Sequence, residues 1–444
     1  MKKSIVNTET NNVVFSVAPG GSLSGTIRVP GDKSISHRSI MLGSLAEGIT
    51  TVTGFLQGED NFATLNAFRA MGVAIDDSDK DRIIIHGVGL HGLCQPEGDL
   101  YLGNSGTSIR LLSGILSGQK FASTMAGDKS LSTRPMARVM NPLREMGANI
   151  HGTEKNTPPL HVEPAENLQG IEYVMPMASA QVKSCLLLAG LYAKGRTCVT
   201  EPAPTRDHTE RMLRGFGYQV ERQGSTVCLE GGGKLTATDV QVPADISSAT
   251  FFIVGACIAE GSDITLTHVG INPTRIGVLN ILKQMGANID ILNERDICGE
   301  PVADIRVRYS ELRGISIPEE QVPLAIDEFP AIFVAAACAQ GETVLTGAEE
   351  LRVKESDRIQ VMANGLQVLG VDARPTPDGI IIQGGRIRAG EVHSHGDHRI
   401  AMSFTMAGLR ASGAITIHDC ANVNTSFPGF AELAQRTGCR ITHN

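Results

Sequence analysis

The sequence predicts an α/β protein of six related units, divided into two domains of three units each. Three observations lead to this prediction: a helix–glycine–strand segment that recurs six times, six apolar helices between these segments, and a resemblance between two proline-containing stretches. The length of 444 residues agrees with it, because one ordinary hydrophobic core does not organise so long a chain.

The recurring segment is each time an amphipathic helix, a glycine and a strand, as in LKQMGANIDI. A glycine in this place suits the left-handed conformation in which many helices end. The segment returns at intervals of roughly 70 to 85 residues. Its six glycines are Gly72, Gly147, Gly217, Gly286, Gly370 and Gly438.

Six further helices are apolar on nearly every face, and each is followed by a glycine and a strand with β-branched residues at alternate positions. A helix without a polar face is buried all round, so we expect these helices inside and the sheets outside, the inverse of the usual barrel. The apolar segments are 38–46, 109–116, 182–193, 248–259, 329–339 and 401–409.

The division into two domains is suggested by the stretch TIRVPGDKSIS before the first unit, which resembles DVQVPADISSA before the fourth. We expect the chain to cross between the domains near Pro30 and Pro243, since proline interrupts strands. Residues 31–243 then hold the first three units, residues 244–444 hold the last three, and residues 1–12 are a loose tail.

Composition excludes several classes of function. The net charge is -8 with both signs interspersed, and there is no tryptophan, so neither a basic face nor a stacking platform for nucleic acid is present. No stretch reaches the roughly 18 uninterrupted apolar residues of a membrane helix, and we expect a cytoplasmic protein.

The nine cysteines form no CxxC pair or zinc spacing, so we expect neither disulfides nor structural metal. Cys185, Cys257 and Cys338 are predicted to be buried, inert thiols.

Polar residues collect where each apolar helix begins. Helix starts offer unpaired N–H groups and the positive end of the helix dipole, so six such starts around one cleft would bind anions. Cations in the first turn oppose that dipole, which predicts bound anions that compensate for Lys33, Arg38, Arg110, Lys183 and Arg399. Further charges follow in other clusters: Lys129, Arg134, Arg206, Arg352, Lys354, Glu355 and Arg358, the last four within one expected helix start. Together they imply more than one anionic substrate.

Simpler interpretations stay open for some of these residues. Asp245, Ser247 and Ser248 serve equally well as ordinary helix caps, and the cluster around Arg358 as a solvated charged face. The histidines in HSHGDHR match no standard metal-site spacing, so no metal is expected there.

Eight motifs together resemble the 5-enolpyruvylshikimate-3-phosphate synthases, and within them the second sequence class: PGDKSISHR, GNSGTSIRL, STRP, MASAQVKSCLLLAGL, RDHTE, IDEFP, LRVKESDR and DHRIAMSF. The resemblance runs from about Val17 to the C-terminus. It implies a two-domain inside-out α/β barrel of the EPT/RTPC-like type, with the active site in the interdomain cleft and residues 13–30 joined to the domain of 244–444.

The activity that the resemblance implies is transfer of the enolpyruvyl group of phosphoenolpyruvate to the 5-hydroxyl of shikimate 3-phosphate, with release of phosphate through a tetrahedral intermediate. This step belongs to the shikimate pathway to chorismate and the aromatic amino acids, and the family includes glyphosate-tolerant members. The resemblance implies a monomer that needs no cofactor and binds neither nucleic acid nor membrane.

The same resemblance assigns site residues. Asp327 would take the proton of the attacking hydroxyl, and Glu355 would give a proton to the methylene and later take one back, with Lys33 counted among the catalytic groups. Shikimate 3-phosphate would contact Lys33, Ser34, Arg38, Ser179, Ala180, Gln181, Arg206, Asp327 and Lys354. Phosphoenolpyruvate would contact Lys33, Gly106, Arg134, Gln181, Arg358 and Arg399.

Two positions depart from what is common in the family. The first class has a lysine near the leaving phosphate where this chain has Thr425, and tolerant members of the second class commonly have alanine at Gly106. Two alternatives are weighed against this activity. The sister transferase acting on UDP-N-acetylglucosamine has a loop cysteine, whereas this chain has none between Cys94 and Cys185. A non-catalytic anion-binding protein would not need the acid and base carboxylates.

Overall fold

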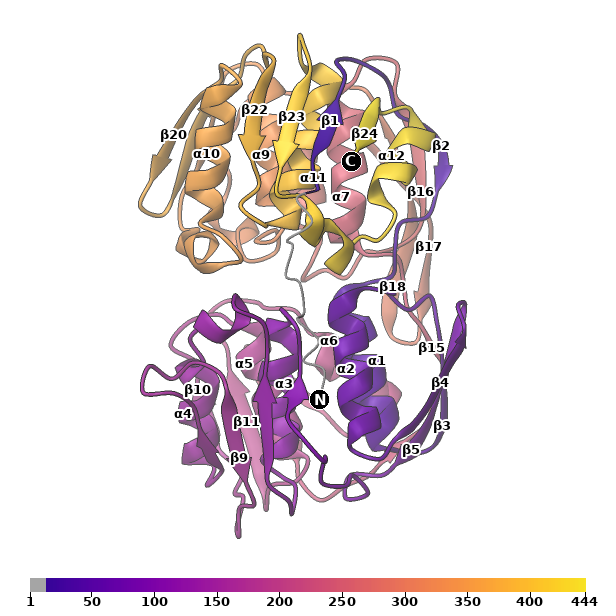
Figure 1. Cartoon of the computed structure of the whole chain (residues 1–444), viewed down its shortest axis with the longest axis vertical. Helices are drawn as coiled ribbons and strands as arrows, with labels where there is room; N and C mark the ends of the chain where they lie inside the picture. The colour runs from indigo at the N-terminus through magenta and orange to yellow at the C-terminus, as the bar shows by residue number, and fades with distance from the viewer. Residues whose placement is uncertain (1–12) are drawn as a thin grey trace, which may run out of the picture.

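We describe residues 13–444 of a computed structural model, and the predicted tail 1–12 lies outside these described residues. Two lobes lie one above the other, each with helices inside and strands on its outer faces (Figure 1). The first lobe has a hydrophobic core drawn from Ile35 to Val242. The core of the second lobe contains Phe15 to Val29 together with Ala244 to Ile441. From this division we propose that the domains are residues 31–243 and residues 13–30 plus 244–444.

Each unit contributes a buried helix, a second helix and one sheet. In the first lobe the helices are α1 (Lys33–Leu45), α2 (Glu59–Ala70), α3 (Gly106–Leu116), α4 (Ala137–Glu145), α5 (Ala180–Gly190) and α6 (His208–Gly215). Its strands are β3 (Ala46–Thr53), β4 (Ala74–Asp79), β5 (Arg82–Val88), β6 (Leu100–Tyr101), β7 (Ser123–Ala126), β8 (Asn149–His151), β9 (Leu160–Glu163), β10 (Glu172–Val174), β11 (Arg196–Thr200), β12 (Glu221–Gln223), β13 (Thr226–Glu230), β14 (Leu235–Thr236) and β15 (Val240–Gln241).

The second lobe repeats the plan. Its helices are α7 (Ile246–Ile258), α8 (Gly277–Gln284), α9 (Phe329–Cys338), α10 (Arg358–Val368), α11 (His398–Ala407) and α12 (Phe430–Thr437). Its strands are β1 (Phe15–Val17), β2 (Ser24–Ile27), β16 (Asp263–Gly270), β17 (Asn288–Ile297), β18 (Glu300–Arg308), β19 (Glu342–Leu345), β20 (Asp372–Thr376), β21 (Gly379–Gln383), β22 (Gly390–His393), β23 (Ile415–His418) and β24 (Ile441–His443).

Six sheets, one for each unit, are present among residues 13–444. Their strand orders are β14-β3-β5-β4 with β15 also on β3, β6-β7-β9-β8, β10-β11-β13-β12, β17-β18-β16-β2, β19-β21-β20 and β22-β23-β1-β24. The six predicted units are therefore confirmed.

The apolar helices form where the sequence predicts them, and all 13 residues of α7 are buried. All six predicted terminating glycines have positive φ, from 79° at Gly217 to 121° at Gly438. These values confirm the predicted left-handed helix ends. Glycine occupies these positions because the side chain of any other residue would be strained in that conformation.

The first strands of the chain belong to the second lobe, as the resemblance implied. β1 pairs antiparallel with both β23 and β24, and β2 pairs parallel with β16. The chain then enters the first lobe and returns beside its own entry. At this point Asp32 N donates to Pro243 O at 2.8 Å and Asp245 N donates to Pro30 O at 2.9 Å.

The expectation of no disulfide is wrong, because Cys198 and Cys228 are joined. They face each other in register on the antiparallel strands β11 and β13, which brings their Cα atoms to 4.2 Å. Strand register is a property of the folded sheet, so the spacing of 30 residues gave no sign of it. Cys185 and Cys257 are buried free thiols as predicted, and burial raises the pKa of Cys257 to about 12. The prediction of full burial is wrong for Cys338, a free thiol at the end of α9 that is only partly buried.

Candidate active site

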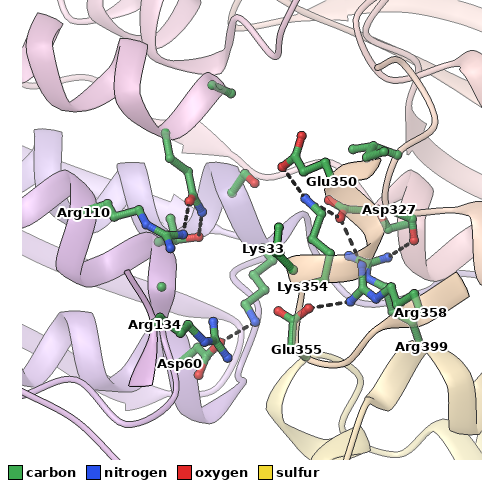
Figure 2. A pocket seen from close by; sticks show the side chains of 18 of the residues that line it. Lys33, Asp60, Arg110, Arg134, Asp327, Glu350, Lys354, Glu355, Arg358 and Arg399 are labelled. Atoms are coloured by element: carbon green, nitrogen blue, oxygen red, sulfur yellow. Dashed lines mark hydrogen bonds and ion pairs between the residues drawn. The ribbon is translucent and has the colours of Figure 1, made fainter. Parts of the chain in front are cut away.

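The starts of the buried helices meet at one cleft between the two lobes, with a volume of about 310 Å³. Figure 2 shows Lys33, Arg110 and Arg134 reaching into it from the first lobe and Asp327, Lys354, Glu355, Arg358 and Arg399 from the second. Lining residues at the helix starts are Lys33, Ser34, Gly106, Thr107, Ala180, Gln181, Ser247, Asp327, His398 and Arg399. The predicted gathering of six helix starts is confirmed.

Local sequence explains why these helices begin at the cleft. Asp32, Ser105, Ser179, Asp245 and Asp397 each accept a hydrogen bond from a backbone N–H of the first turn. Only part of the N–H groups of each first turn is satisfied in this way, so the remainder point into the cleft with the positive end of the dipole. The simpler interpretation of Asp245 as a cap is thus correct.

The second-lobe wall is organised by Arg358, whose side chain is 1% exposed. Its Nη2 lies 2.6 Å from Glu355 Oε2, its Nη1 3.3 Å from Asp327 Oδ1 and its Nε 2.8 Å from Asp397 Oδ2. Asp327 also pairs with Arg206, which comes from the first lobe. One guanidinium thus holds both predicted catalytic carboxylates.

These cations keep the two carboxylates ionised. Burial alone raises the pKa of Asp327, but Arg206, Lys354, Arg399 and Arg358 outweigh burial and hold the pKa well below its usual range. Burial likewise raises the pKa of Glu355, and Arg358 and Arg134 reverse the effect, so that this pKa is also below its ordinary value. In the cleft without substrate both groups are bases.

The first-lobe wall differs, because Arg110, Arg134 and Arg138 pair with no carboxylate among the described residues. Arg134 Nη2 donates to the side-chain oxygen Oδ1 of Asn104, and Arg110 Nη1 donates to the side-chain oxygen Oε1 of Gln181. Burial lowers the pKa of Arg110 to about 9, with Arg138 and Arg134 adding like-charge repulsion. Such an arrangement favours an anion between them.

Most predicted site residues lie on the cleft surface. They are Lys33, Ser34, Gly106, Arg134, Ser179, Ala180, Gln181, Arg206, Asp327, Lys354, Glu355, Arg358 and Arg399. Arg38 does not line it. Its guanidinium is buried behind Ser34, donates to the Ser34 carbonyl at 2.9 Å and reaches Thr209 Oγ1 at 2.7 Å.

Two details of the sequence interpretation are wrong. Lys183 needs no bound anion, because this fully buried cation lies 2.9 Å from Glu201 and 2.8 Å from Glu210. Lys354 and Glu355 do not sit in a helix start but in the connection between the short helix Glu349–Val353 and α10.

Several residues of the cleft were missed by the sequence interpretation. Asp60 on α2 pairs with Lys33. It was missed because an acidic residue in the first turn of a helix is already explained by its favourable interaction with the helix dipole. Arg138 and Arg275 also line the cleft, and neither belongs to a polar cluster in the sequence. Thr425 is at the cleft too, where its hydroxyl donates to Asn422 O at 2.7 Å and brings no charge.

Among residues 13–444, no group of three or more His, Cys, Asp or Glu side chains is placed to hold a metal ion. No helix in this part of the chain has the length and apolar character needed to span a membrane.

Comparison with known proteins gives one consistent family. The sequence model of EPSP synthase (3-phosphoshikimate 1-carboxyvinyltransferase) matches residues 17–433. A 3-phosphoshikimate 1-carboxyvinyltransferase from Methylococcus capsulatus is 68% identical over 430 residues, which cover 97% of this chain and 98% of that protein.

Solved structures agree with the sequence match. EPSP synthase from Acinetobacter baumannii is similar with a TM-score of 0.89 and 62% identity, over 97% of this chain and all (100%) of that chain. The enolpyruvyl transferase NikO from Streptomyces tendae has a TM-score of 0.78 at 16% identity, over 98% of this chain and 99% of that chain, so it shares the fold. The predicted two-domain inside-out α/β fold is confirmed.

Proposed function

The chain belongs to the EPSP synthase family, and from this premise we propose that its cleft transfers the enolpyruvyl group of phosphoenolpyruvate to the 5-hydroxyl of shikimate 3-phosphate. The observation that carries the proposal is the opposition of two walls. Two ionised carboxylates held by Arg358 face Arg110, Arg134 and Arg138, which have no carboxylate partner within residues 13–444. The arginines of the first-lobe wall suit anionic substrates, and the carboxylates of the second-lobe wall suit proton transfer.

Asp327 is the proposed base for the acceptor hydroxyl. It is ionised, and Lys354 Nζ lies 3.7 Å from its Oδ1. As the hydroxyl oxygen bonds to the central carbon of phosphoenolpyruvate, its proton passes to this carboxylate. The surrounding cations stabilise the charge that remains on the tetrahedral intermediate.

Glu355 is the proposed acid and later base at the methylene carbon. In the unliganded cleft it is ionised because Arg358 and Arg134 outweigh the effect of burial on its pKa. The phosphate and carboxylate of phosphoenolpyruvate offset these cations when bound, so the pKa rises and the group can carry a proton. It gives that proton to the methylene, and takes one back from the resulting methyl as phosphate leaves.

Substrate contacts follow from the same walls. Ser34, Ser179, Ala180, Gln181, Arg206 and Lys354 would surround shikimate 3-phosphate, with Arg38 fixing the turn at Ser34 from behind. Lys33, Gly106, Arg134, Gln181, Arg358 and Arg399 would surround phosphoenolpyruvate. Arg110 and Arg138 add charge on the phosphate side, where Thr425 supplies none.

A coupled phosphate-release assay with each acceptor tests the function. We expect release with phosphoenolpyruvate and shikimate 3-phosphate, and none with UDP-N-acetylglucosamine in place of the acceptor. The proposal is contradicted if phosphate is released with UDP-N-acetylglucosamine but not with shikimate 3-phosphate. It is also contradicted if no phosphate is released with either acceptor. Membership of the second sequence class, a monomeric state and a cytoplasmic location remain predictions from the sequence.

A further inference from the structure

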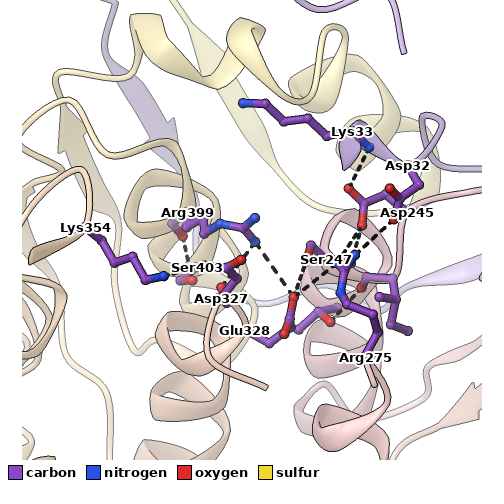
Figure 3. A network of polar contacts seen from close by, with 12 residues as sticks. Asp32, Lys33, Asp245, Ser247, Arg275, Asp327, Glu328, Lys354, Arg399 and Ser403 are labelled. Carbon is purple, nitrogen blue, oxygen red and sulfur yellow. Dashed lines mark hydrogen bonds and ion pairs between the residues drawn. The ribbon is translucent and has the colours of Figure 1, made fainter. Parts of the chain in front are cut away.

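A second cluster of charges lies beside the catalytic residues, around Arg275. This residue is in the connection between β16 and α8 in the second lobe and is 3% exposed. Figure 3 shows its guanidinium between Asp32, Asp245 and Glu328, with Lys33 on one side and Asp327 and Arg399 on the other. The cluster therefore sits between residues that act from opposite walls.

The contacts of Arg275 join the two lobes. Its Nη1 lies 3.1 Å from Asp32 Oδ2 and 3.4 Å from His208 Nε2, both in the first lobe. Its Nη2 lies 3.2 Å from Asp245 Oδ1, donates to Ser247 Oγ at 2.7 Å and is 3.8 Å from Glu328 Oε1, all in the second lobe. One planar, rigid cation thus holds groups from both lobes at fixed separations.

The carboxylates that Arg275 contacts lie at the starts of three of the buried helices, α1, α7 and α9. Asp32 caps α1 by accepting from Ile35 N at 2.8 Å, and Asp245 caps α7 by accepting from Ser247 N at 2.8 Å. Glu328 immediately precedes α9 and follows Asp327. Lys33 therefore adjoins one of these carboxylates and Asp327 another, so a movement of either helix start moves a proposed catalytic group.

The same connection makes a second tie between the lobes through Asn272. Its amide nitrogen donates to Asp207 Oδ1 at 2.7 Å and to Glu300 Oε2 at 2.9 Å. His208 Nδ1 lies 2.8 Å from the other oxygen of Glu300. Residues 272–275 therefore contact the starts of α1 and α6 in the first lobe while belonging to the second.

The charge of Arg275 is already matched by protein carboxylates, in contrast to Arg110 and Arg138 on the first-lobe wall. Burial alone raises the pKa of Asp32, but Arg275 and His208 reverse this and lower the pKa to about 2. Removing the guanidinium would leave the buried carboxylates Asp32, Asp245 and Glu328 facing one another, and their repulsion would push the helix starts apart. The charge of Arg275 is thus used within the protein, although the residue lines the cleft.

We propose that Arg275 is a positioning residue which fixes the spacing between the start of α1 and the starts of α7 and α9, and so sets the distance across the cleft between Lys33 and Asp327 before substrate binds. Its effect on turnover rests on the proposed function, whereas its effect on lobe spacing does not. The side chains that contact the substrates come from both walls of the cleft. A small change of this spacing therefore slows the reaction more than it weakens the binding of either substrate.

The experiment compares the parent with Arg275→Met, which removes the charge, and Arg275→Lys, which keeps the charge but replaces the rigid planar fork by a single flexible ammonium. Arg306→Met is the matched control, since Arg306 forms an exposed pair with Asp263 on the outer sheet. Circular dichroism checks folding, small-angle scattering gives the radius of gyration, and phosphate release gives kcat and KM. Calorimetry gives the Kd of shikimate 3-phosphate.

For Arg275→Met we expect a larger unliganded radius of gyration, a kcat at least about tenfold lower and a Kd within about threefold of the parent. Arg275→Lys should lie between, and Arg306→Met should match the parent. A folded Arg275→Met with the parent's radius overturns the proposal, whatever its kcat. Failure of both Arg275 variants to fold also overturns it, because the role is then structural. A parent that releases no phosphate refutes the proposed function, and the unliganded radii still decide the role of Arg275.

Discussion

Replacing Gly106 by alanine tests how tightly the first-lobe arginines enclose the cleft. A Cβ at this position would lie 3.0 Å from Arg134 Nη1 and 3.2 Å from Arg110 Nη1. Both guanidiniums would have to move by a few tenths of an ångström. They end flexible side chains and Gly106 is the first residue of α3, where alanine gains up to about 1 kcal/mol of helix propensity. We therefore expect the variant to fold and the change to be confined to the cleft.

The substitution should affect glyphosate more than phosphoenolpyruvate, because glyphosate is the longer ligand. With phosphoenolpyruvate placed beside Gly106 as proposed, glyphosate would need the space there that a methyl group would fill. We expect glyphosate to compete with phosphoenolpyruvate in the parent, and its inhibition constant to rise at least about tenfold in Gly106→Ala, equivalent to about 1.4 kcal/mol. The shift of Arg134 should raise the KM for phosphoenolpyruvate less, by about threefold at most.

Inhibition constants measured at matched phosphoenolpyruvate and salt decide the matter. Gly98→Ala is the control, because a Cβ there would have no atom within 4 Å. Equal inhibition constants for the parent and Gly106→Ala would show that this glycine does not control access of the inhibitor.

Four further outcomes are expected. Glu355→Gln should lose turnover by roughly a hundredfold with both substrates still bound, while the exposed Glu349→Gln keeps it; near-parent turnover removes Glu355 from the mechanism. Saturating shikimate 3-phosphate should decrease the radius of gyration of the parent, and an unchanged radius argues against closure. Arg138→Gln should raise the KM for phosphoenolpyruvate about tenfold with a smaller change in kcat, and an unchanged KM would exclude Arg138 from the phosphate side. The pKa of Asp32 is about 2 in the folded protein, below its ordinary value near 4. The ionised Asp32 carboxylate therefore stabilises the fold fully above about pH 4, and this stabilisation is lost as pH falls through about 2. The melting temperature of Asp32→Asn should therefore approach that of the parent between pH 7 and pH 3, and a constant difference contradicts this.

The units and the cleft could be predicted because their signals are local. An apolar helix such as α7 is recognisable from its own residues, and the glycine that ends a helix lies directly after it. Since each unit repeats the same order, the starts of its buried helices were expected at one end of each lobe, and they line the cleft. Motif resemblance then supplied roles for Asp327 and Glu355 that the pattern alone left open.

What could not be predicted depends on partners distant in the sequence. The charge of Lys183 is matched by Glu201 and Glu210, which a first-turn argument does not see. Cys198 meets Cys228 only through strand register. Arg275 stands alone in the sequence, and its importance arises because tertiary structure places three carboxylates around it.

The position of β1 also affects how the protein is assembled during synthesis. This strand lies between β23 and β24, so Phe15 can pair with Ile417 and His443 only after these distant residues have been synthesised. The first lobe, residues 31–243, is complete in sequence while some 200 residues of the chain have still to emerge from the ribosome, and domains generally fold as units in the order of synthesis. The second lobe then closes around β1, a strand made before the first lobe, and its sheet is completed by β24, which is made after the other strands of that sheet.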